Sequence, residues 1–255
     1  MTTQKALVTG GLGFVGSNLV DRLVNLGWQV HVVDDLSSGK IEHKNPEATY
    51  TIADFKDYLE VSDESIDVVF HLAAYKKAPK NSTQSSDVMI NNVDMIKSII
   101  NLVSKTKAYL IFTSTSDIYG NSDNFLESES ITIGPPNVER YSYAMSKFFD
   151  EQLLLNLVNE GRIRCAITRI FGCFSERSSK SWSGGHVPLF IEKAMKNEDI
   201  TIHGSGLQTR SMIHAHEIVD GLCKMLDNKE KINGQIINLG TSEEMSVLDC
   251  AKLIL

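Results

Sequence analysis

Tyr143 and Lys147 stand four residues apart in the segment YAMSK. In a helix this spacing places the phenol and the ammonium group on one face, one turn from each other. A free tyrosine has a pKa of about 10 and is a poor base at neutral pH, but a neighbouring cation favours the phenolate. The pair can therefore transfer a proton, with Tyr143 as the base. In isolation, the same spacing more often means a core tyrosine and a solvated lysine.

A run of hydroxyl side chains, TSTS at positions 113–116, ends an apolar segment that begins near Ala108, and Asp117 follows it. Parallel sheets present their functional residues at the carboxyl ends of the strands. Thr115 can there hydrogen-bond a substrate hydroxyl and share its proton with Tyr143. This context favours the catalytic interpretation of the tyrosine and the lysine.

A glycine-rich segment, TGGLGFVG from Thr9 to Gly16, directly follows the first apolar run. Glycine lets the backbone turn tightly and approach a pyrophosphate, whose charge is met by free N–H groups and the positive end of a helix dipole. The residues that we expect to hold the pyrophosphate of a dinucleotide are Gly10, Gly13, Phe14, Val15 and Gly16.

Asp34 and Asp35 end the second apolar run, about 20 residues after the glycines, where an acid can bind a ribose diol. A carboxylate there also repels a 2′-phosphate, and no arginine stands beside it. The pattern therefore predicts NAD rather than NADP, although Lys40 is a nearby cation.

Two further segments are expected to line the cofactor along the same edge of the sheet. Asp54 can accept a hydrogen bond from the adenine amino group, with Phe55 beside the ring, although an acid at a strand end is also common on a protein surface. The segment Leu72-Ala73-Ala74 after the fourth apolar run lets a flat cofactor lie against the backbone.

The elements that must position these residues are predicted from short apolar runs that alternate with helical periodicity. Strands are expected at Lys5–Thr9, Gln29–Asp34, Tyr50–Ala53, Ile66–His71, Ala108–Thr113, Arg164–Ile170 and Ile200–His203, and helices at Phe14–Leu26, Ser86–Thr106, Tyr143–Asn159, Val187–Lys196, Ala215–Leu226 and from Val247 onward. This order predicts a doubly wound parallel sheet of the Rossmann type. We expect an NAD-binding domain over residues 1–170 and a smaller carboxyl-terminal substrate lobe over 171–255, with some elements returning to the Rossmann body. Ser175–Gly185 is expected to be a loop, either a solvated connector or a lid over the substrate.

Composition narrows the class of protein. A net charge of −7 argues against a nucleic-acid partner, because phosphate binding needs clustered Lys and Arg. The four cysteines are scattered without CxxC spacing, so neither a metal site nor a disulfide framework is predicted. No signal peptide or membrane-spanning run is found, and we expect a cytoplasmic protein with no membrane partner.

Together, the motifs GxxGxxG, the acid that ends the second strand, HLAA at 71–74, the hydroxyl run before IYG, and YxxxK resemble the extended short-chain dehydrogenase/reductase family. The resemblance extends from about Thr9 to Leu253, and the segments at 91–93, 168–171 and 204–210 resemble those of sugar-nucleotide epimerases and decarboxylases. The resemblance implies roles for these residues: Tyr143 as base, Lys147 as its partner and nicotinamide-ribose ligand, Thr115 and Asp117 in the catalytic set, Asn92 at the cofactor, and Lys76 and Arg210 at the nucleotide-sugar substrate. Arg210 would bind its diphosphate.

The resemblance implies a reaction that begins by oxidising the sugar at C4 to a 4-keto intermediate. Dehydratases of this family carry an acidic pair after the threonine, whereas Ser116-Asp117 offers only the second acid. Thr115-Ser116-Asp117 resembles the Thr-Ser-Glu of glucuronate decarboxylases, while the segments 71–76 and 91–93 look more like UDP-glucose 4-epimerase. We favour a UDP-sugar 4-epimerase, with UDP-glucuronate decarboxylase or 4,6-dehydratase as the alternative. Gly172 and His216 depart from the family pattern and leave the substrate open.

A noncatalytic NAD-binding protein is a second alternative, because a Rossmann body can persist without its substrate lobe. Members of the family normally continue past the point where this chain ends, at Leu255. The resemblance also implies a homodimer that pairs through the helices at 86–106 and 143–159. A pure sensor has no chemical need for a hydroxyl, a phenol and an ammonium group together, and so catalysis is favoured.

Overall fold

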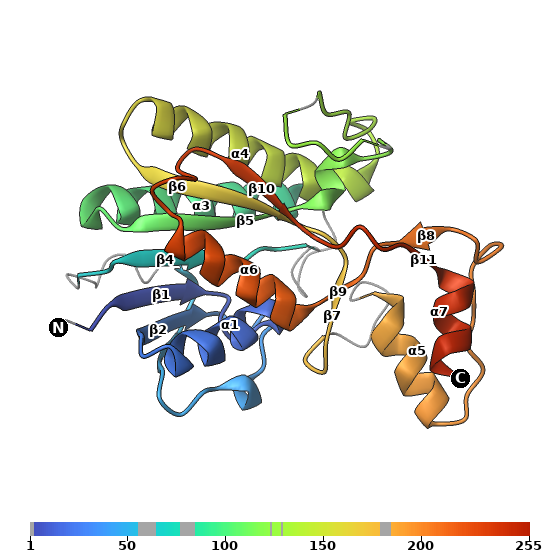
Figure 1. Ribbon diagram of the computed structural model, residues 1–255. Coiled ribbons are helices and arrows are strands. Elements are labelled where there is room, and N and C mark those ends of the chain that lie inside the picture. The colour runs from blue at the N-terminus through green and yellow to red at the C-terminus, as the bar shows by residue number, and fades with distance from the viewer. Residues whose placement is uncertain (1–2, 56–64, 77–84, 123, 129, 179–184) are drawn as a thin grey trace.

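Figure 1 shows the computed structural model, which describes residues 3–55, 65–76, 85–122, 124–128, 130–178 and 185–255. In these ranges the main sheet has seven strands in the order β10-β6-β5-β4-β1-β2-β3, and every neighbouring pair is parallel. Its strands are β1 Lys5–Thr9, β2 Gln29–Asp34, β3 Thr49–Ile52, β4 Val68–His71, β5 Tyr109–Thr115, β6 Arg164–Ile170 and β10 Ile236–Leu239. The strand order runs outward from β1 in both directions, which confirms the predicted doubly wound Rossmann fold.

Helices cover both faces of this sheet (Figure 1). The helices α1 Phe14–Asn25 and α6 Ala215–Asp227 cover one face, and α3 Ser85–Thr106 and α4 Ser142–Asn159 cover the other. Successive side chains of β1 alternate between the two cores: Ala6 and Val8 pack on the side of α1 and α6, and Leu7 packs on the side of α3 and α4. Burial on both faces explains why the central strands are continuous apolar runs.

A smaller lobe extends from the sheet near its carboxyl edge (Figure 1). It contains α5 His186–Met195, α7 Val247–Ile254 and the antiparallel pair β8 Thr209–Arg210 and β11 Met245–Ser246. Its own core includes Phe190 of α5 and Ala251 of α7. Two short parallel strands, β7 Cys173–Phe174 and β9 Ile213–His214, lie where the chain leaves and re-enters the main body, and α6 and β10 belong to that body.

The segment Ile200–His203, predicted to be a strand, has no regular secondary structure. The prediction was wrong because Ile200 and Ile202 pack against the core of the small lobe without a strand to pair with. The other predicted elements occur within two residues of their expected bounds, whereas β10 and the short strands β7, β8, β9 and β11 were not predicted. Residues 179–184 of the predicted loop Ser175–Gly185 lie outside the described residues.

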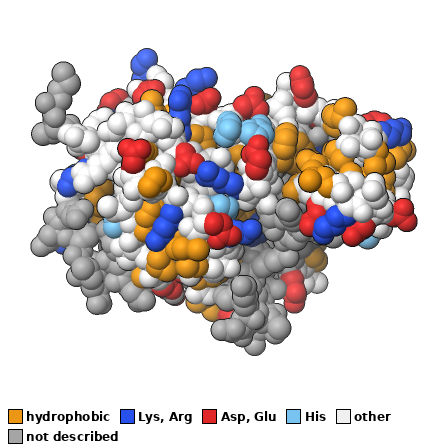
Figure 2. All heavy atoms as spheres, turned by 90° about the horizontal axis from the view of Figure 1, so that it is seen from below, with side chains coloured by type: hydrophobic (Ala, Val, Ile, Leu, Met, Phe, Trp, Pro, Cys, Tyr) orange, Lys and Arg blue, Asp and Glu red, His pale blue; other side chains and the backbone are white. Residues whose placement is uncertain are grey.

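On the face in Figure 2, Lys and Arg side chains are scattered among Asp and Glu and do not form a continuous basic surface. This fits the net charge of −7. Among the described helices, none is both long and apolar enough to cross a bilayer. In the same ranges, no group of three or more His, Cys, Asp and Glu could hold a metal ion.

Candidate active site

The glycine-rich loop between β1 and α1 can form only with glycine at two of its positions. Gly10 has φ +71°, and a Cβ there would lie 2.8 Å from the backbone nitrogen of Ala73. A Cβ on Gly16 would collide with the carbonyl oxygen of Gly10. The loop therefore lies directly against the segment after β4, where the backbone nitrogen of Ala73 also donates to Oγ1 of Thr9 over 3.3 Å. Two of the predicted cofactor segments are thus brought together.

The first turn of α1 suits an anion. The helix begins after Gly13, with no side-chain cap and no acidic residue in its first turn, and Phe14 and Val15 are half-buried. Its leading N–H groups and the positive end of its dipole are directed toward the glycine loop. These features fit the pyrophosphate of NAD at Gly10, Gly13 and Gly16.

The two acids at the end of β2 have different surroundings. The carboxylate of Asp34 is 6% exposed and accepts hydrogen bonds from the backbone N–H of Leu12 and of Leu36, each over 2.9 Å. Burial raises the pKa of Asp34. A carboxylate has about four acceptor positions, so two remain for a ribose diol. Asp34 thus ties the glycine loop to the predicted ribose position.

Asp35 accepts hydrogen bonds from the hydroxyl of Tyr75 over 2.7 Å and from the backbone N–H of Ser37 over 2.8 Å. Burial alone would raise the pKa of Asp35, but the hydrogen bonds from Ser37 and Tyr75 outweigh burial and lower it. Asp35 therefore stays ionised at neutral pH and maintains negative charge where a 2′-phosphate would have to lie.

The residues predicted at the adenine end differ in exposure. Asp54 is half-buried after β3, whereas Phe55 is 4% exposed and packs in the core on the α3 and α4 side. The ring of Phe55 lies 6.5 Å from that of His71, centroid to centroid. Phe55 is therefore mainly a core residue, with little surface left for a ligand.

The helix α4 carries the predicted base and its partner. Tyr143 is half-buried and Lys147 is 1% exposed, with Nζ 4.3 Å from the ring centroid of Phe112 on β5. The interpretation of Lys147 as a solvated surface residue is therefore excluded. Nζ of Lys76 lies 5.6 Å from the ring centroid of Tyr143 and forms an ion pair of 3.5 Å with Asp117. Three of the predicted site residues, Tyr143, Lys76 and Asp117, thus lie together, and Lys147 lies in the interior on the same helix as Tyr143.

Asn92 of α3 is 2% exposed and links α4 to the segment after β4 by hydrogen bonds. Its side-chain NH2 group donates to Oγ of Ser146 and to the carbonyl oxygen of Tyr75, both over 3.0 Å, and its Oδ1 accepts from the backbone N–H of Tyr75 over 2.8 Å. Ser146 in turn donates to the carbonyl oxygen of Tyr143 over 2.8 Å. Because Tyr75 also binds Asp35, hydrogen bonds connect the predicted ribose end of the site with the predicted base.

Thr115 ends β5 and is 7% exposed. Its Oγ1 accepts a hydrogen bond from the backbone N–H of Asp117 over 3.1 Å and caps the short helix η2, Ser116–Tyr119. This cap fixes Asp117 beside Lys76. The shared proton between Thr115 and Tyr143 stays a prediction.

Electrostatics at the base differ from the expectation for the isolated pair. Burial raises the pKa of Tyr143, and the negative charges of Asp117 and Asp150 raise it further. Burial lowers the pKa of Lys147 to about 8, against the opposing effects of Asp150 and Glu151. Without ligand, Tyr143 is therefore a neutral phenol at pH 7, and Lys147 alone does not ionise it. The positive charge of bound NAD would favour the phenolate.

Arg210 lies on β8 in the small lobe, exposed, with its guanidinium donating to the carbonyl oxygen of Thr209 over 2.8 Å. No contact in the described ranges joins it to Tyr143, so its assignment to the substrate diphosphate stays a prediction.

A buried ion pair supports α4 from behind and was not predicted. Arg169 of β6 donates two hydrogen bonds to the carboxylate of Glu151, over 3.1 and 2.7 Å, and both side chains are 2% exposed. The guanidinium carbon of Arg169 lies 4.9 Å from the ring centroid of Tyr119. Arg169 and Glu151 are 18 residues apart and lie on different elements, so no spacing within the helix could have indicated the pair.

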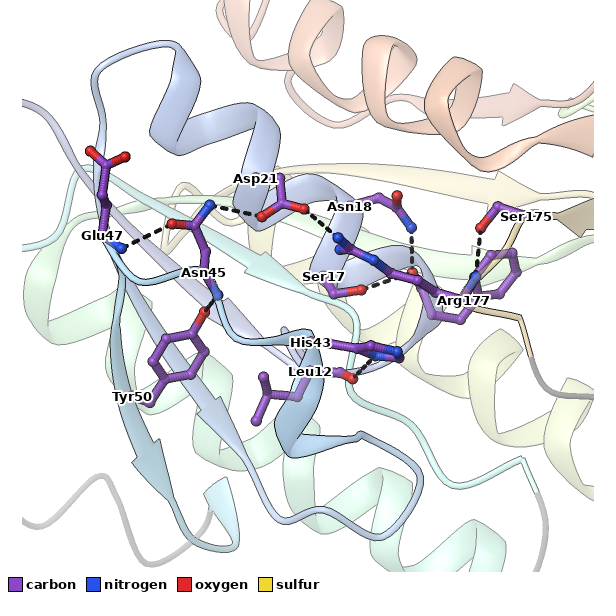
Figure 3. Close-up of polar contacts among 11 residues, drawn as sticks. Leu12, Ser17, Asn18, Asp21, His43, Asn45, Glu47, Tyr50, Ser175 and Arg177 are labelled. Atoms are coloured by element: carbon purple, nitrogen blue, oxygen red, sulfur yellow. Dashed lines mark hydrogen bonds and ion pairs between the residues drawn. The ribbon is translucent and has the colours of Figure 1, made fainter.

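A second polar network lies beside α1 and connects it with two other segments (Figure 3). Asp21 of α1 forms an ion pair of 2.7 Å with Arg177, which follows β7, and accepts a hydrogen bond of 2.8 Å from Asn45. The backbone N–H of Asn45 is directed at the hydroxyl of Tyr50 over 2.7 Å. The helix of the cofactor loop is thereby tied to the entrance of the small lobe.

The sequence matches the NAD dependent epimerase/dehydratase family over residues 6–240. It is 32% identical to UDP-N-acetyl-alpha-D-glucosaminuronate decarboxylase of Bacillus cytotoxicus, over 98% of this chain and 78% of that protein. It is 29% identical to UDP-glucuronic acid decarboxylase 1 of Danio rerio, over 98% of this chain but only 60% of that protein. Among solved structures, UDP-glucose 4-epimerase of Thermotoga maritima with UDP-glucose is similar at a TM-score of 0.85 and 26% identity, over 98% of this chain and 81% of that one.

The matched region contains the glycine loop, the acids of β2 and the helix with Tyr143 and Lys147, whose surroundings fit NAD. The match to this NAD dependent family confirms the predictions of the family and of NAD as the cofactor. This chain belongs to the NAD dependent epimerase/dehydratase family.

Proposed function

We propose that the protein is a UDP-sugar 4-epimerase that works through a 4-keto intermediate. The observation that carries the proposal is the arrangement around Tyr143: its helix places Lys147 in the interior, Lys76 and Asp117 lie beside the ring, and Asn92 fixes the helix. A noncatalytic NAD-binding protein needs none of these groups in one place.

Bound NAD would supply hydride acceptance from C4 of the sugar and its return. Tyr143 accepts the proton of the 4-hydroxyl group at its phenolic oxygen and gives it back at the end of the cycle. Thr115 hydrogen-bonds the same hydroxyl, and Lys147 binds the nicotinamide ribose and stabilises the phenolate by its charge. Arg210 binds the diphosphate, for which a guanidinium fork is suited. Epimerisation needs no further acid, since the ketone only has to present its other face.

UDP-glucuronate decarboxylation is the second candidate, and two observations favour it. The two curated relatives reported above are decarboxylases of nucleotide-linked uronic acids. Lys76, beside Tyr143, is also a cation that could meet a substrate carboxylate. A 4,6-dehydratase is disfavoured, because Ser116 stands where those enzymes carry the first of two acids.

The test is a product assay with purified protein, NAD and UDP-glucose, UDP-N-acetylglucosamine or UDP-glucuronate in separate reactions. The 4-epimer, detected by proton NMR, is the expected product. A UDP-pentose with released carbon dioxide would replace the first candidate by the second. No conversion of any substrate, in a sample that binds NAD, would favour the noncatalytic alternative.

We further propose that the protein is a homodimer that pairs through α3 and α4. Ile90 on α3 is 57% exposed, and Phe148 and Phe149 on α4 are 37% and 50% exposed, so apolar side chains face outward on both helices. Sedimentation should give twice the mass of 28.3 kDa. Phe149→Glu should return the mass to that of one chain.

The four free cysteines suit a reducing compartment, and we propose the cytoplasm as the location of the protein.

A further inference from the structure

Asp150 is a buried acid that the proposed mechanism does not use. It follows Lys147 by three residues on α4, a spacing that places both side chains on one face of the helix. Each residue is 1% exposed. The Oδ1 atom of Asp150 has no hydrogen-bond partner in the described part of the chain. In this state the carboxylate stays ionised only if a compensating positive charge lies nearby.

The neighbouring charges leave Lys147 as that partner. Glu151 is next in sequence, but its carboxylate is occupied by the two hydrogen bonds from Arg169, so these two groups neutralise each other. His71 of β4 is neutral, because burial lowers its pKa well below the ordinary value and the charge of Lys147 lowers it further. In the interior behind Tyr143, the unmatched charges are therefore those of Lys147 and Asp150.

Beside the ring of Tyr143, the charges of Lys76 and Asp117 are already balanced. Asp117 of η2 lies beside the ring and is paired with Lys76 at 3.5 Å. These two groups are about half exposed, so solvent screens them far more than the interior pair. Asp150 and Lys147 are each 1% exposed, so solvent screens their charges little. In such surroundings an opposite charge within about 4–6 Å shifts a pKa by about 1–3 units.

We propose that Asp150 is a positioning residue that acts as counter-charge to Lys147, retains its ammonium group in the interior and so sets the pH range in which Tyr143 and Lys147 work. The directions of the pKa shifts agree: burial raises the pKa of Asp150, and Lys147 opposes this effect. Burial lowers the pKa of Lys147, and Asp150 is the first charge that opposes it. The inference rests on the proposed function for its kinetic consequence, but not for its titration.

The direct test follows the ammonium group of Lys147 without any substrate. The protein is labelled with 13C at the lysine ε-carbon, and the resonance that disappears in Lys147→Met is followed by NMR from pH 5 to pH 11. In Asp150→Asn the midpoint of that resonance should fall by about one pH unit or more. An unchanged midpoint would overturn the proposal, whatever reaction the protein catalyses.

Two controls keep the test decisive. Asp150→Ser also removes the charge and must give the same direction of shift if Asp150→Asn does not fold. In the wild type itself, coupling to a carboxyl group predicts a second inflection of the same resonance at lower pH, and a single inflection counts against the proposal. Asp94→Asn, an exposed acid paired with Lys97 on α3, should leave the resonance unchanged.

The kinetic test applies once a substrate is found. For Asp150→Asn, the alkaline limb of the pH profile of kcat/KM should move to lower pH by the same amount as the NMR midpoint. A purely structural role would lower kcat/KM at every pH without moving the limb. A moved NMR midpoint in a protein without turnover would support the inference and reject the proposed function.

Discussion

Asn92 on α3 donates a hydrogen bond to Ser146 on α4 over 3.0 Å. The same NH2 group also donates to the carbonyl oxygen of Tyr75, and the hydroxyl of Tyr75 donates to the carboxylate of Asp35. One amide therefore couples the helix that carries the base to the acidic end of β2. Ser146 in turn donates to the carbonyl oxygen of Tyr143, so the amide of Asn92 helps to fix the position of the tyrosine.

Replacing Asn92 by Ala should destabilise the protein by about 2–3 kcal/mol, because several buried polar groups lose their partner at once. We also expect kcat to fall about tenfold or more, since a displaced base loses its alignment. Urea unfolding and the product assay measure the two effects. Asn91→Ala is the matched control, because Asn91 Nδ2 bonds to the carbonyl oxygen of Asp87 in its own helix. Equal effects of the two variants would contradict this role for Asn92.

Tyr143→Phe should lower turnover by about 10²–10⁴-fold, the usual contribution of a general base. Affinity for NAD, measured by calorimetry, should change little, because the fold and the glycine loop are untouched. Tyr50→Phe is the control, since its hydroxyl contacts Asn45 beside α1 and not the predicted base. Undiminished turnover in Tyr143→Phe would reject the assigned role.

The sequence predicted the sheet and its loop motifs because these depend on short-range patterns. The alternation of apolar runs with helical segments predicted the order of the main strands along the chain, and the glycine spacing located the loop at Gly10 and Gly16. Strand β10 was missed because only pairing with β6 identifies it. The strand expected at 200–203 does not form. Its apolar residues pack against the core between α5 and α7, so their apolar character does not reflect strand pairing.

The electrostatics of the site could not be predicted from spacing. The segment YAMSK predicted that Lys147 and Tyr143 share one face of a helix, but not that burial dominates the pKa of each. Likewise, Arg169 and Glu151 are 18 residues apart, and only the packing of α4 on β6 brings them together. Phe55 was predicted at the adenine because of its position after β3, but it is 4% exposed and packs in the core.

Removing one partner of the buried ion pair should be costly. Glu151→Gln leaves Arg169 with an uncompensated charge in the interior, and we expect a loss of about 3–5 kcal/mol in the free energy of unfolding. Glu160→Gln is the control: its pair with Arg162 is exposed, and its loss should cost less than about 1 kcal/mol. Urea unfolding measures both. Similar values for the two variants would show that the interior pair is better solvated than its 2% exposure indicates.

The lowered pKa of Lys147 predicts how stability changes at alkaline pH. Its pKa falls from 10.5 in the unfolded chain to about 8 in the folded protein, so between these values the unfolded chain binds more protons. The contribution of Lys147 to the free energy of unfolding should therefore rise with pH between about 8 and 10.5. Lys147→Met should remove that contribution, whereas Lys97→Met, at an exposed position, should retain it. Identical pH slopes for the wild type and Lys147→Met would contradict a lowered pKa.

Gly16→Ala tests whether the loop between β1 and α1 has the tight geometry that a pyrophosphate needs. Its new methyl group would collide with the carbonyl oxygen of Gly10, a backbone atom that can move only if the loop opens. We expect a loss of about 1–3 kcal/mol in stability and a weaker affinity for NAD by about tenfold or more. Gly27→Asn is the control, because Gly27 has open space and φ +84°, which asparagine tolerates. Unchanged NAD affinity in Gly16→Ala would mean that the cofactor does not depend on the close approach of these two glycines.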